Sequence, residues 1–270
     1  MIRLSKIILF FTAVVLLAWL LPWTYRFLTV RPDRTPFTLY SCVTESFASI
    51  DFNDGDIVRH DASGKTYTDR EFDSILPLFY YRQLLSDGRQ PDTLRGVALT
   101  PQTVSMQSFY FRNSPSDINK VKPELYPLLE AMSGRVELQM PPDVFRIHDR
   151  IEFIDMATNR VNDRKSDLFT RALQAKGFEF PAACVSGNPT TRKEYDEGYL
   201  MVDNNHRVFH VKQTKGLPYV RETGVAPELG IEHVAITEFS NRKTLGLLTD
   251  KDNNLYVLNR DYTLHKLPID

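Results

Sequence analysis

The chain of 270 residues is long enough for one large or two modest domains, and its 42% hydrophobic and 25% charged residues are typical of a globular protein. Its 33 lysines and arginines nearly cancel its 34 aspartates and glutamates. The charges therefore create no strong electrostatic field that would recruit nucleic acid. The proportion of hydrophobic to charged residues excludes a disordered chain as the starting expectation.

An uncharged apolar segment close to the N-terminus is the strongest signal in the sequence. Residues 7–25 carry no charged side chain, and at ~1.5 Å per residue a helix of this length matches the ~30 Å hydrocarbon core of a bilayer. Trp19, Trp23 and Tyr25 gather at its C-terminal end, where amphipathic rings favour the headgroup level. No small-residue cleavage signal follows, so we expect an uncut transmembrane anchor in contact with the lipid bilayer.

The anchor divides the chain into parts that we expect on opposite sides of the membrane. Residues 1–6 are expected as a cytoplasmic tail, 26–36 as a proline-stiffened linker, and 37–270 as an extracytoplasmic β-rich domain. Basic residues flank the anchor on both sides: Arg3, Lys6, Arg26, Arg31 and Arg34. The short tail is easily retained in the cytoplasm, so we expect a single-pass protein with its body outside the cytoplasm.

Three later segments have the apolar spacing and end signals of helices: residues 70–88, 122–134 and 166–177. Thr68 or Asp69 caps the first, and Pro77 is expected to kink it or divide it in two. Ser166 is expected to be the N-cap of the third. Each of the three ends with a glycine, as helices often do.

The rest of the body shows the pattern of β-strands, in which short β-branched and aromatic runs alternate with turn residues. The two Asn-Asn doublets, 204–205 and 253–254, are expected at tight turns that require positive φ. Ile50-Asp51 and Ile154-Asp155 hold matching places in strand-turn-strand segments that lead into a helix. The predicted fold class is mainly β with a few helices (α+β), built from antiparallel hairpins and meanders. The blade-like units are propeller-like but too few to close a propeller.

The sequence predicts no catalytic residue, no cofactor and no metal ligand set. The Asp-rich turn after Asp250 has Leu255 where a calcium loop needs glycine, so we interpret it as a hairpin turn. His206 and His210 lie about 13 Å apart if they share a strand, at ~3.3 Å per residue, which is too far for one zinc ion.

One loop, residues 186–199, is the candidate for recognition because it combines aromatic and charged side chains. The candidate binding residues are Asn188, Arg192, Lys193, Tyr195, Asp196, Glu197 and Tyr199. A solvated linker into the C-terminal meander is the competing interpretation. Cys42 and Cys184 would form one disulfide in an oxidising compartment, or stay as two buried thiols.

Four segments carry a resemblance to a known family: LPLFYYRQLLSDGRQPDTLRG, SGRVELQMPPDVFRI, IEFIDMATNRVN and GNPTTRKEYDEGY. With them the chain resembles an uncharacterised family of bacterial membrane proteins that contain a domain of unknown function. The resemblance covers most of the chain after the anchor. It implies a single-pass protein of the bacterial inner membrane with its body in the periplasm, and an accessory role beside transporters of the ATP-binding-cassette type. It brings no catalytic residues with it.

Three hypotheses of function follow. The first is a non-catalytic, membrane-anchored extracytoplasmic accessory or interaction protein of a membrane transport or envelope complex. The alternative is a ligand-binding or glycan-binding β module, which requires a concave pocket lined by aromatic rings. The third is an extracytoplasmic hydrolase that uses carboxylates drawn from Asp155, Asp196 and Glu197.

Overall fold

The computed structural model describes residues 2–29, 36–53, 56–107, 111, 123–132 and 137–267. The chain divides into two compact units, Met1–Pro101 (unit 1) and Gln102–Asp270 (unit 2). An N-terminal apolar helix is followed by several antiparallel sheets, so the predicted fold class is confirmed. Among the described residues no sheet closes on itself.

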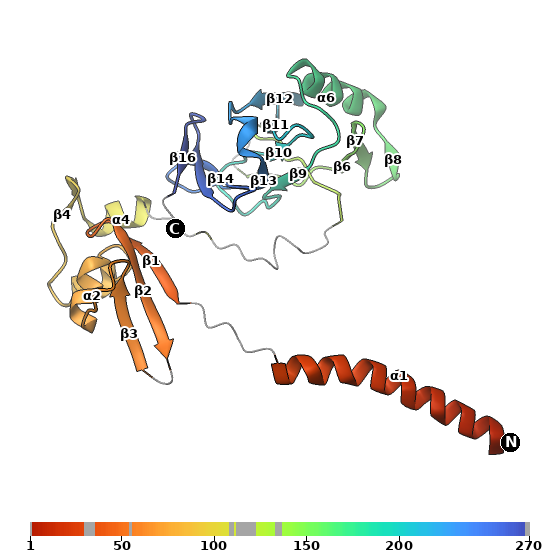
Figure 1. The fold of residues 1–270 in the computed structure, drawn as a ribbon. Helices are drawn as coiled ribbons and strands as arrows, with labels where there is room; N and C mark the ends of the chain where they lie inside the picture. Colours follow the sequence, from red (N-terminus) through yellow and green to blue (C-terminus); the bar gives the residue numbers. More distant parts are fainter. Residues whose placement is uncertain are drawn as a thin grey trace. The chain divides into compact units, whose positions relative to one another are not determined.

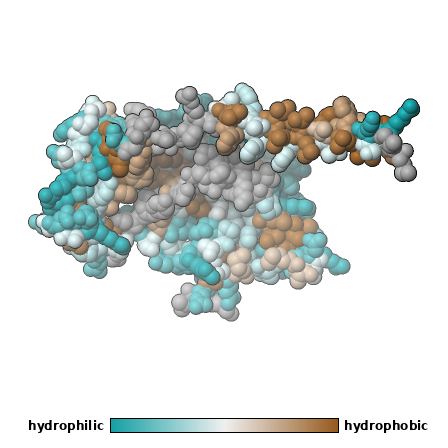
Figure 2. Space-filling view, turned by 90° about the horizontal axis from the view of Figure 1, so that it is seen from below, coloured by the Kyte–Doolittle hydropathy of each residue, from teal (hydrophilic) through white to brown (hydrophobic). Residues whose placement is uncertain are grey.

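Helix α1 (Ile2–Thr29) extends the expected anchor at both ends. Between Arg3 and Thr29 it is long and apolar enough to cross a membrane, with a mean hydropathy of 2.4, and none of this stretch is buried in the protein. In Figure 2 brown side chains cover most of the helix, and polar ones lie at its N-terminal end. A helix of this composition requires an apolar environment to cover its surface.

Unit 1 contains a three-stranded antiparallel meander covered by short helices. The strands β1 (Phe37–Ser41), β2 (Ser46–Asn53) and β3 (Asp56–Asp61) pair in chain order. The other elements are α2 (Asp69–Ile75), α3 (Tyr81–Ser86), the pair β4 (Thr93–Leu94) and β5 (Val97–Ala98), and α4 (Pro101–Gln107), which crosses into unit 2.

The first predicted helix is divided in two, as expected. Helix α2 ends at Ile75, shortly before Pro77, which lacks the N–H that a continuing helix needs. The Glu71 carboxylate accepts hydrogen bonds from the backbone N and Oγ1 of Thr68, at 2.9 and 2.7 Å, and fixes the start of α2. Gly88 takes a positive φ of 64° directly after α3.

The first sheet of unit 2 is a second three-stranded meander, β6 (Asp143–Ile147), β7 (Ile151–Asp155) and β8 (Arg160–Val161), which is followed by α6 (Asp163–Ala175). Two four-stranded meanders follow (Figure 1). The first is β9 (Cys184–Gly187), β10 (Tyr199–Val202), β11 (Val208–Thr214) and β12 (Leu217–Glu222). After η1 (Pro227–Leu229), the second is β13 (Ile231–Ile236), β14 (Thr244–Asp250), β15 (Leu255–Asn259) and β16 (Leu264–Lys266).

Strand β10 lies at the centre of unit 2 and is buried on both faces. Tyr199 and Met201 pack into a core with the aromatic rings of β6, β7 and α6. Leu200 and Val202 point to the opposite face and pack against the second four-stranded sheet. This double burial explains why the strand is a continuous apolar run with no polar alternation.

The prediction of a helix over 122–134 is wrong for the described residues 123–132. Tyr126 forms an antiparallel bridge with Phe145, and Glu130 a parallel bridge with Gln213. Tyr126 precedes a proline, which disfavours the helical backbone, and pairing with β6 and β11 supplies the hydrogen bonds that a helix would have made.

The predicted N-cap of the third helix is also wrong. Helix α6 begins at Asp163, and Asn162 is its N-cap, accepting a hydrogen bond from the backbone N of Lys165. Ser166 is buried inside the helix, where its hydroxyl accepts from the backbone N of Phe153 and donates to the carbonyl of Asn162. The serine therefore joins the helix to β7.

Three hairpins share one turn, in which a buried aspartate accepts backbone N–H groups two and four residues later. These aspartates are Asp61, Asp203 and Asp250. The residue three positions later has positive φ in each case: Gly64, His206 and Asn253. The expectation for the Asn-Asn doublets is thus confirmed at Asn253 but wrong at the first doublet, where His206 takes this conformation.

Candidate functional site

The candidate loop lies between β9 and β10 and packs on the loop that joins β13 to β14. Glycines at both ends make this path available. A Cβ at Gly187 would overlap the ring of Tyr199, and a Cβ at Gly198, which has a φ of 66°, would overlap the carbonyl oxygen of Val211. The loop can therefore leave and re-enter the sheet in close contact with β10 and β11.

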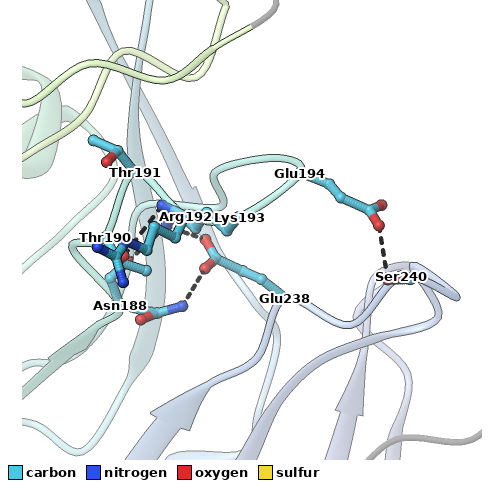
Figure 3. Close-up of a pocket in the computed structure, with 8 residues that line it drawn as sticks. All are labelled: Asn188, Thr190, Thr191, Arg192, Lys193, Glu194, Glu238 and Ser240. Atoms are coloured by element: carbon cyan, nitrogen blue, oxygen red, sulfur yellow. Dashed lines mark hydrogen bonds and ion pairs between the residues drawn. The ribbon is translucent and has the colours of Figure 1, made fainter.

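A buried lysine holds the two loops together (Figure 3). The Lys193 ammonium lies 2.6 Å from Asp196 Oδ1, 2.6 Å from Glu238 Oε1 and 2.7 Å from the carbonyl oxygen of Asn188. The Lys193, Asp196 and Glu238 side chains are only 6%, 2% and 1% exposed. We call these three residues the Lys193 triad. All three ammonium hydrogens have an acceptor, which a buried charge requires.

Desolvation raises the pKa of both carboxyl groups in the triad, and the Lys193 charge opposes that effect. Both carboxylates also accept hydrogen bonds from the loop itself. Glu238 accepts from the backbone N of Glu197 and from Asn188 Nδ2, each at 2.8 Å. Asp196 accepts from the backbone N of Gly198 at 3.1 Å. The triad is therefore an internal clamp, in which every charge has a partner.

Three further contacts close the same pair of loops. The Tyr195 hydroxyl donates to the carbonyl oxygen of Phe239 at 2.7 Å, and burial raises the pKa of Tyr195 to about 12. The Ser240 hydroxyl donates to Glu194 at 3.0 Å. The guanidinium of Arg242 lies 4.6 Å from the centre of the Tyr195 ring. The loop is thus fixed along its length.

Glu197 organises a second buried network under the loop. Its carboxylate contacts Lys212 at 2.8 Å and also forms an ion pair with Arg260. His210 Nε2 lies 2.7 Å from the carbonyl oxygen of Glu197, and His210 Nδ1 lies 2.8 Å from the hydroxyl of Tyr262.

The burial of His210 fixes its protonation state. Desolvation lowers the pKa of His210 to about 4, so the ring is neutral at neutral pH. Because a carbonyl oxygen can only accept, Nε2 carries the proton, and Nδ1 accepts from the hydroxyl of Tyr262.

An open pocket of about 600 Å³ lies on the outer side of the clamp. Its lining is polar and consists of Asn188, Thr190, Thr191, Arg192, Lys193, Glu194, Glu238 and Ser240, as Figure 3 shows. Lys193 and Glu238, whose side chains are almost completely buried, are already paired with each other. Arg192 is exposed at its rim. No aromatic ring lines it, unlike the pockets that bind sugars or drug-sized ligands.

The structure divides the candidate binding residues into exposed and buried groups. Asn188 and Arg192 are exposed at the pocket, the Lys193 side chain is buried, and Tyr195 is partly buried. Asp196, Glu197 and Tyr199 are buried, and the Tyr199 hydroxyl donates to the carbonyl oxygen of Pro127. The loop is therefore a packed part of unit 2, not a solvated linker.

Sequence reasoning missed the partners of these charges. They are Glu238, His210, Lys212, Arg260 and Tyr262. Glu238 is the first acidic residue after the end of β13. Its position next to a largely apolar strand is a weak signal for a buried acid. None of the others stands at a spacing that indicates a site.

The carboxylates of the hydrolase hypothesis are each engaged separately. Asp155 accepts hydrogen bonds from the backbone N and hydroxyl of Thr158 in its own turn. Asp196 and Glu197 are neutralised by the lysines and the arginine described above. Within the described residues no group of three or more His, Cys, Asp or Glu side chains could hold a metal ion.

The two cysteines lie in different units. Cys42 follows β1 in unit 1, and Cys184 is the first residue of β9 in unit 2. Both are partly buried. Their pairing stays a prediction.

Residues 37–270 match the model of a protein family described as a domain of unknown function (DUF4857). The chain therefore belongs to this family. The matched part starts at the first residue of β1 and contains the whole candidate site. No curated protein and no solved structure matches the chain.

Proposed function

We propose that this protein is a non-catalytic accessory component of a membrane transport or envelope complex. In this proposal α1 anchors it in the bacterial inner membrane, and residues 37–270 lie in the periplasm. The length, hydropathy and exposure of α1 support the anchor. The resemblance described above supports a transporter of the ATP-binding-cassette type as the partner complex.

The Lys193 triad is the observation on which the binding role depends. A catalytic acid or base has to exchange a proton with its substrate and must be within reach of it. The carboxylates of Asp196 and Glu238 are 2% and 1% exposed and already have their partners. Their charges therefore serve to hold the loop rigid, and a rigid surface loses little entropy on binding.

The surface offered to a partner is the polar rim of the pocket. Its exposed members are Asn188, Thr191, Arg192, Glu194 and Ser240. Hydrogen-bonding groups around an open depression suit a protein surface of complementary polarity. A sugar ligand has less support because no aromatic ring lines the pocket.

Site-specific photo-crosslinking in native membranes tests this role. A photoreactive residue at Thr191, at the rim, is expected to crosslink to an integral membrane component of a transport system. The same residue at exposed Glu232 on β13 is the control and should give no such product. Arg192→Glu is expected to reduce the yield at Thr191. Recovery of the full chain without companions, or equal products at both positions, would refute the proposal.

Membrane topology is tested separately with reporters fused behind Asp270. A phosphatase that is active only outside the cytoplasm should be active there, and a reporter that fluoresces only in the cytoplasm should be silent. The opposite pattern would place the body in the cytoplasm and contradict the proposed location.

A further inference from the structure

The sheet of unit 1 has one apolar face that continues past the helices that cover it. Directly paired residues of an antiparallel sheet point to the same side. Phe37 pairs with Ile50, and Phe52 pairs with Ile57. Ile50 and Phe52 are two residues apart on β2, so all four side chains share this face.

Coverage of this face stops abruptly. At one end Ala48 and Ile50 are 1% and 8% exposed because Phe72 and Leu76, from α2 and its C-terminal end, pack on them. At the other end the exposed fractions rise to 44% for Phe37, 51% for Phe52 and 51% for Ile57.

Phe79, between α2 and α3, enlarges the uncovered area. It is 55% exposed, and its ring centre lies 5.7 Å from that of Phe37. We call the four residues Phe37, Phe52, Ile57 and Phe79 the apolar end patch. Exposed aromatic and aliphatic side chains gathered in this way indicate an interaction surface.

The chain itself restricts where this patch can lie. Phe37 is the first residue of β1, and it lies only eight Cα–Cα steps beyond Thr29, the last residue of α1. At ~3.5 Å per residue, that stretch spans at most about 28 Å. If α1 crosses a bilayer, the end of the sheet that carries the patch is therefore tethered close to the lipid surface. The turn 42–45, at the opposite end of β1, has no such tether.

We propose that the apolar end patch docks into the interfacial region of the bilayer that holds α1. This inference rests on the proposed membrane anchoring. Docking would bury the half-exposed rings of Phe37, Phe52 and Phe79, as aromatic side chains favour at the level of the lipid headgroups. It would also restrict the orientation of unit 1 relative to the membrane plane.

The charges around the patch indicate which lipids suffice. Arg59 on β3 forms an ion pair with Asp69 at 2.7 Å, and Asp56 at the start of β3 is exposed. These three charged residues give the described part of the sheet and α2 no cationic excess that would attract anionic lipid. Zwitterionic phosphatidylcholine is therefore sufficient for docking.

The test uses the full chain in nanodiscs of phosphatidylcholine, with bromine-labelled acyl chains as the quencher. Both tryptophans, Trp19 and Trp23, lie in α1, so their quenching reports insertion of the anchor alone. A fluorophore at Ile57→Cys reports on the patch. The same fluorophore at Val43→Cys, 49% exposed in turn 42–45, is the matched control. Cys42 and Cys184 are replaced by serine in all samples.

Lipid quenching of the label at position 57, without quenching at position 43, is the expected result. The double variant Phe52→Ser, Phe79→Ser should lower the ratio of docked to undocked unit 1 by about tenfold or more, because the burial of both rings in lipid is lost. Leu217→Ser, at a 60% exposed position of unit 2, should leave it unchanged. Circular dichroism checks that each variant is folded.

The other outcomes separate this inference from the proposed function. If lipid quenches the tryptophans but only aqueous iodide quenches the label at position 57, docking is overturned while the anchor is supported. Unquenched tryptophans would contradict the anchor itself. A label at position 57 that is shielded from both quenchers would mean that protein covers the patch, which also overturns docking in lipid.

Discussion

Replacing Lys193 by methionine tests the clamp directly, because methionine keeps most of the apolar stem and removes the charge. The variant loses three hydrogen bonds of 2.6 to 2.7 Å. Asp196 then keeps one hydrogen bond, from Gly198, and Glu238 keeps two, from Glu197 and Asn188. Both carboxylates stay buried without a cation, so we expect a loss of about 3–5 kcal/mol in the free energy of unfolding at pH 8.

The loss should depend on pH in a definite direction. Burial already raises the pKa of Asp196 and Glu238, and removal of Lys193 raises both further. A carboxyl group whose pKa is higher in the folded state binds a proton there first, so stability falls as pH rises through the folded pKa. The cost of Lys193→Met should therefore be smaller at pH 5 than at pH 8.

Urea unfolding of the full chain in mild detergent, followed by pulse proteolysis, measures this loss. Tryptophan fluorescence is unsuitable because Trp19 and Trp23 both lie in α1. Lys212→Met is the matched control, since Glu197 keeps Arg260 after Lys212 is removed. We expect it to cost about 1 kcal/mol. A loss below 1 kcal/mol for Lys193→Met, an equal loss for the control, or no dependence on pH would refute the clamp.

Gly198→Ala should destabilise unit 2 by about 2–4 kcal/mol, from positive φ and from overlap with the carbonyl of Val211. Gly224→Ala, at a positive φ in open space, should cost only about 1 kcal/mol, and equal urea midpoints would contradict this. Because the pKa of His210 falls from 6.5 to about 4 on folding, its contribution to stability should be lost as pH falls below 6.5. Denaturation between pH 4 and 7.5 should show a smaller pH dependence for His210→Gln. At Asp250, burial opposes ionisation, but hydrogen bonds within the turn prevail and lower the pKa from 3.8 to about 2. Its contribution should persist above pH 3.8 and disappear as pH falls through 2, and Asp250→Asn should abolish this acid-dependent loss.

Local signals were sufficient to predict much of the fold. The charge-free run of α1 needs no tertiary contact to be recognised, because its length and hydropathy are properties of the segment alone. Pro77 divided the first helix for an equally local reason, the missing N–H. The antiparallel meanders follow from alternating apolar runs and tight turns between sequence neighbours.

Only the tertiary structure decided the state of the candidate loop. The sequence placed Lys193, Asp196 and Glu197 in one charged stretch, a pattern that is also typical of a solvated linker. Their burial depends on opposite charges from distant parts of the chain. Glu238, 45 residues after Lys193, pairs with that lysine, and Arg260, 63 residues after Glu197, pairs with that glutamate. Likewise, Tyr126 is extended because it pairs with Phe145 on β6. No local pattern encodes such partners, since the burial of a charge is favourable only when distant elements complete its hydrogen bonds.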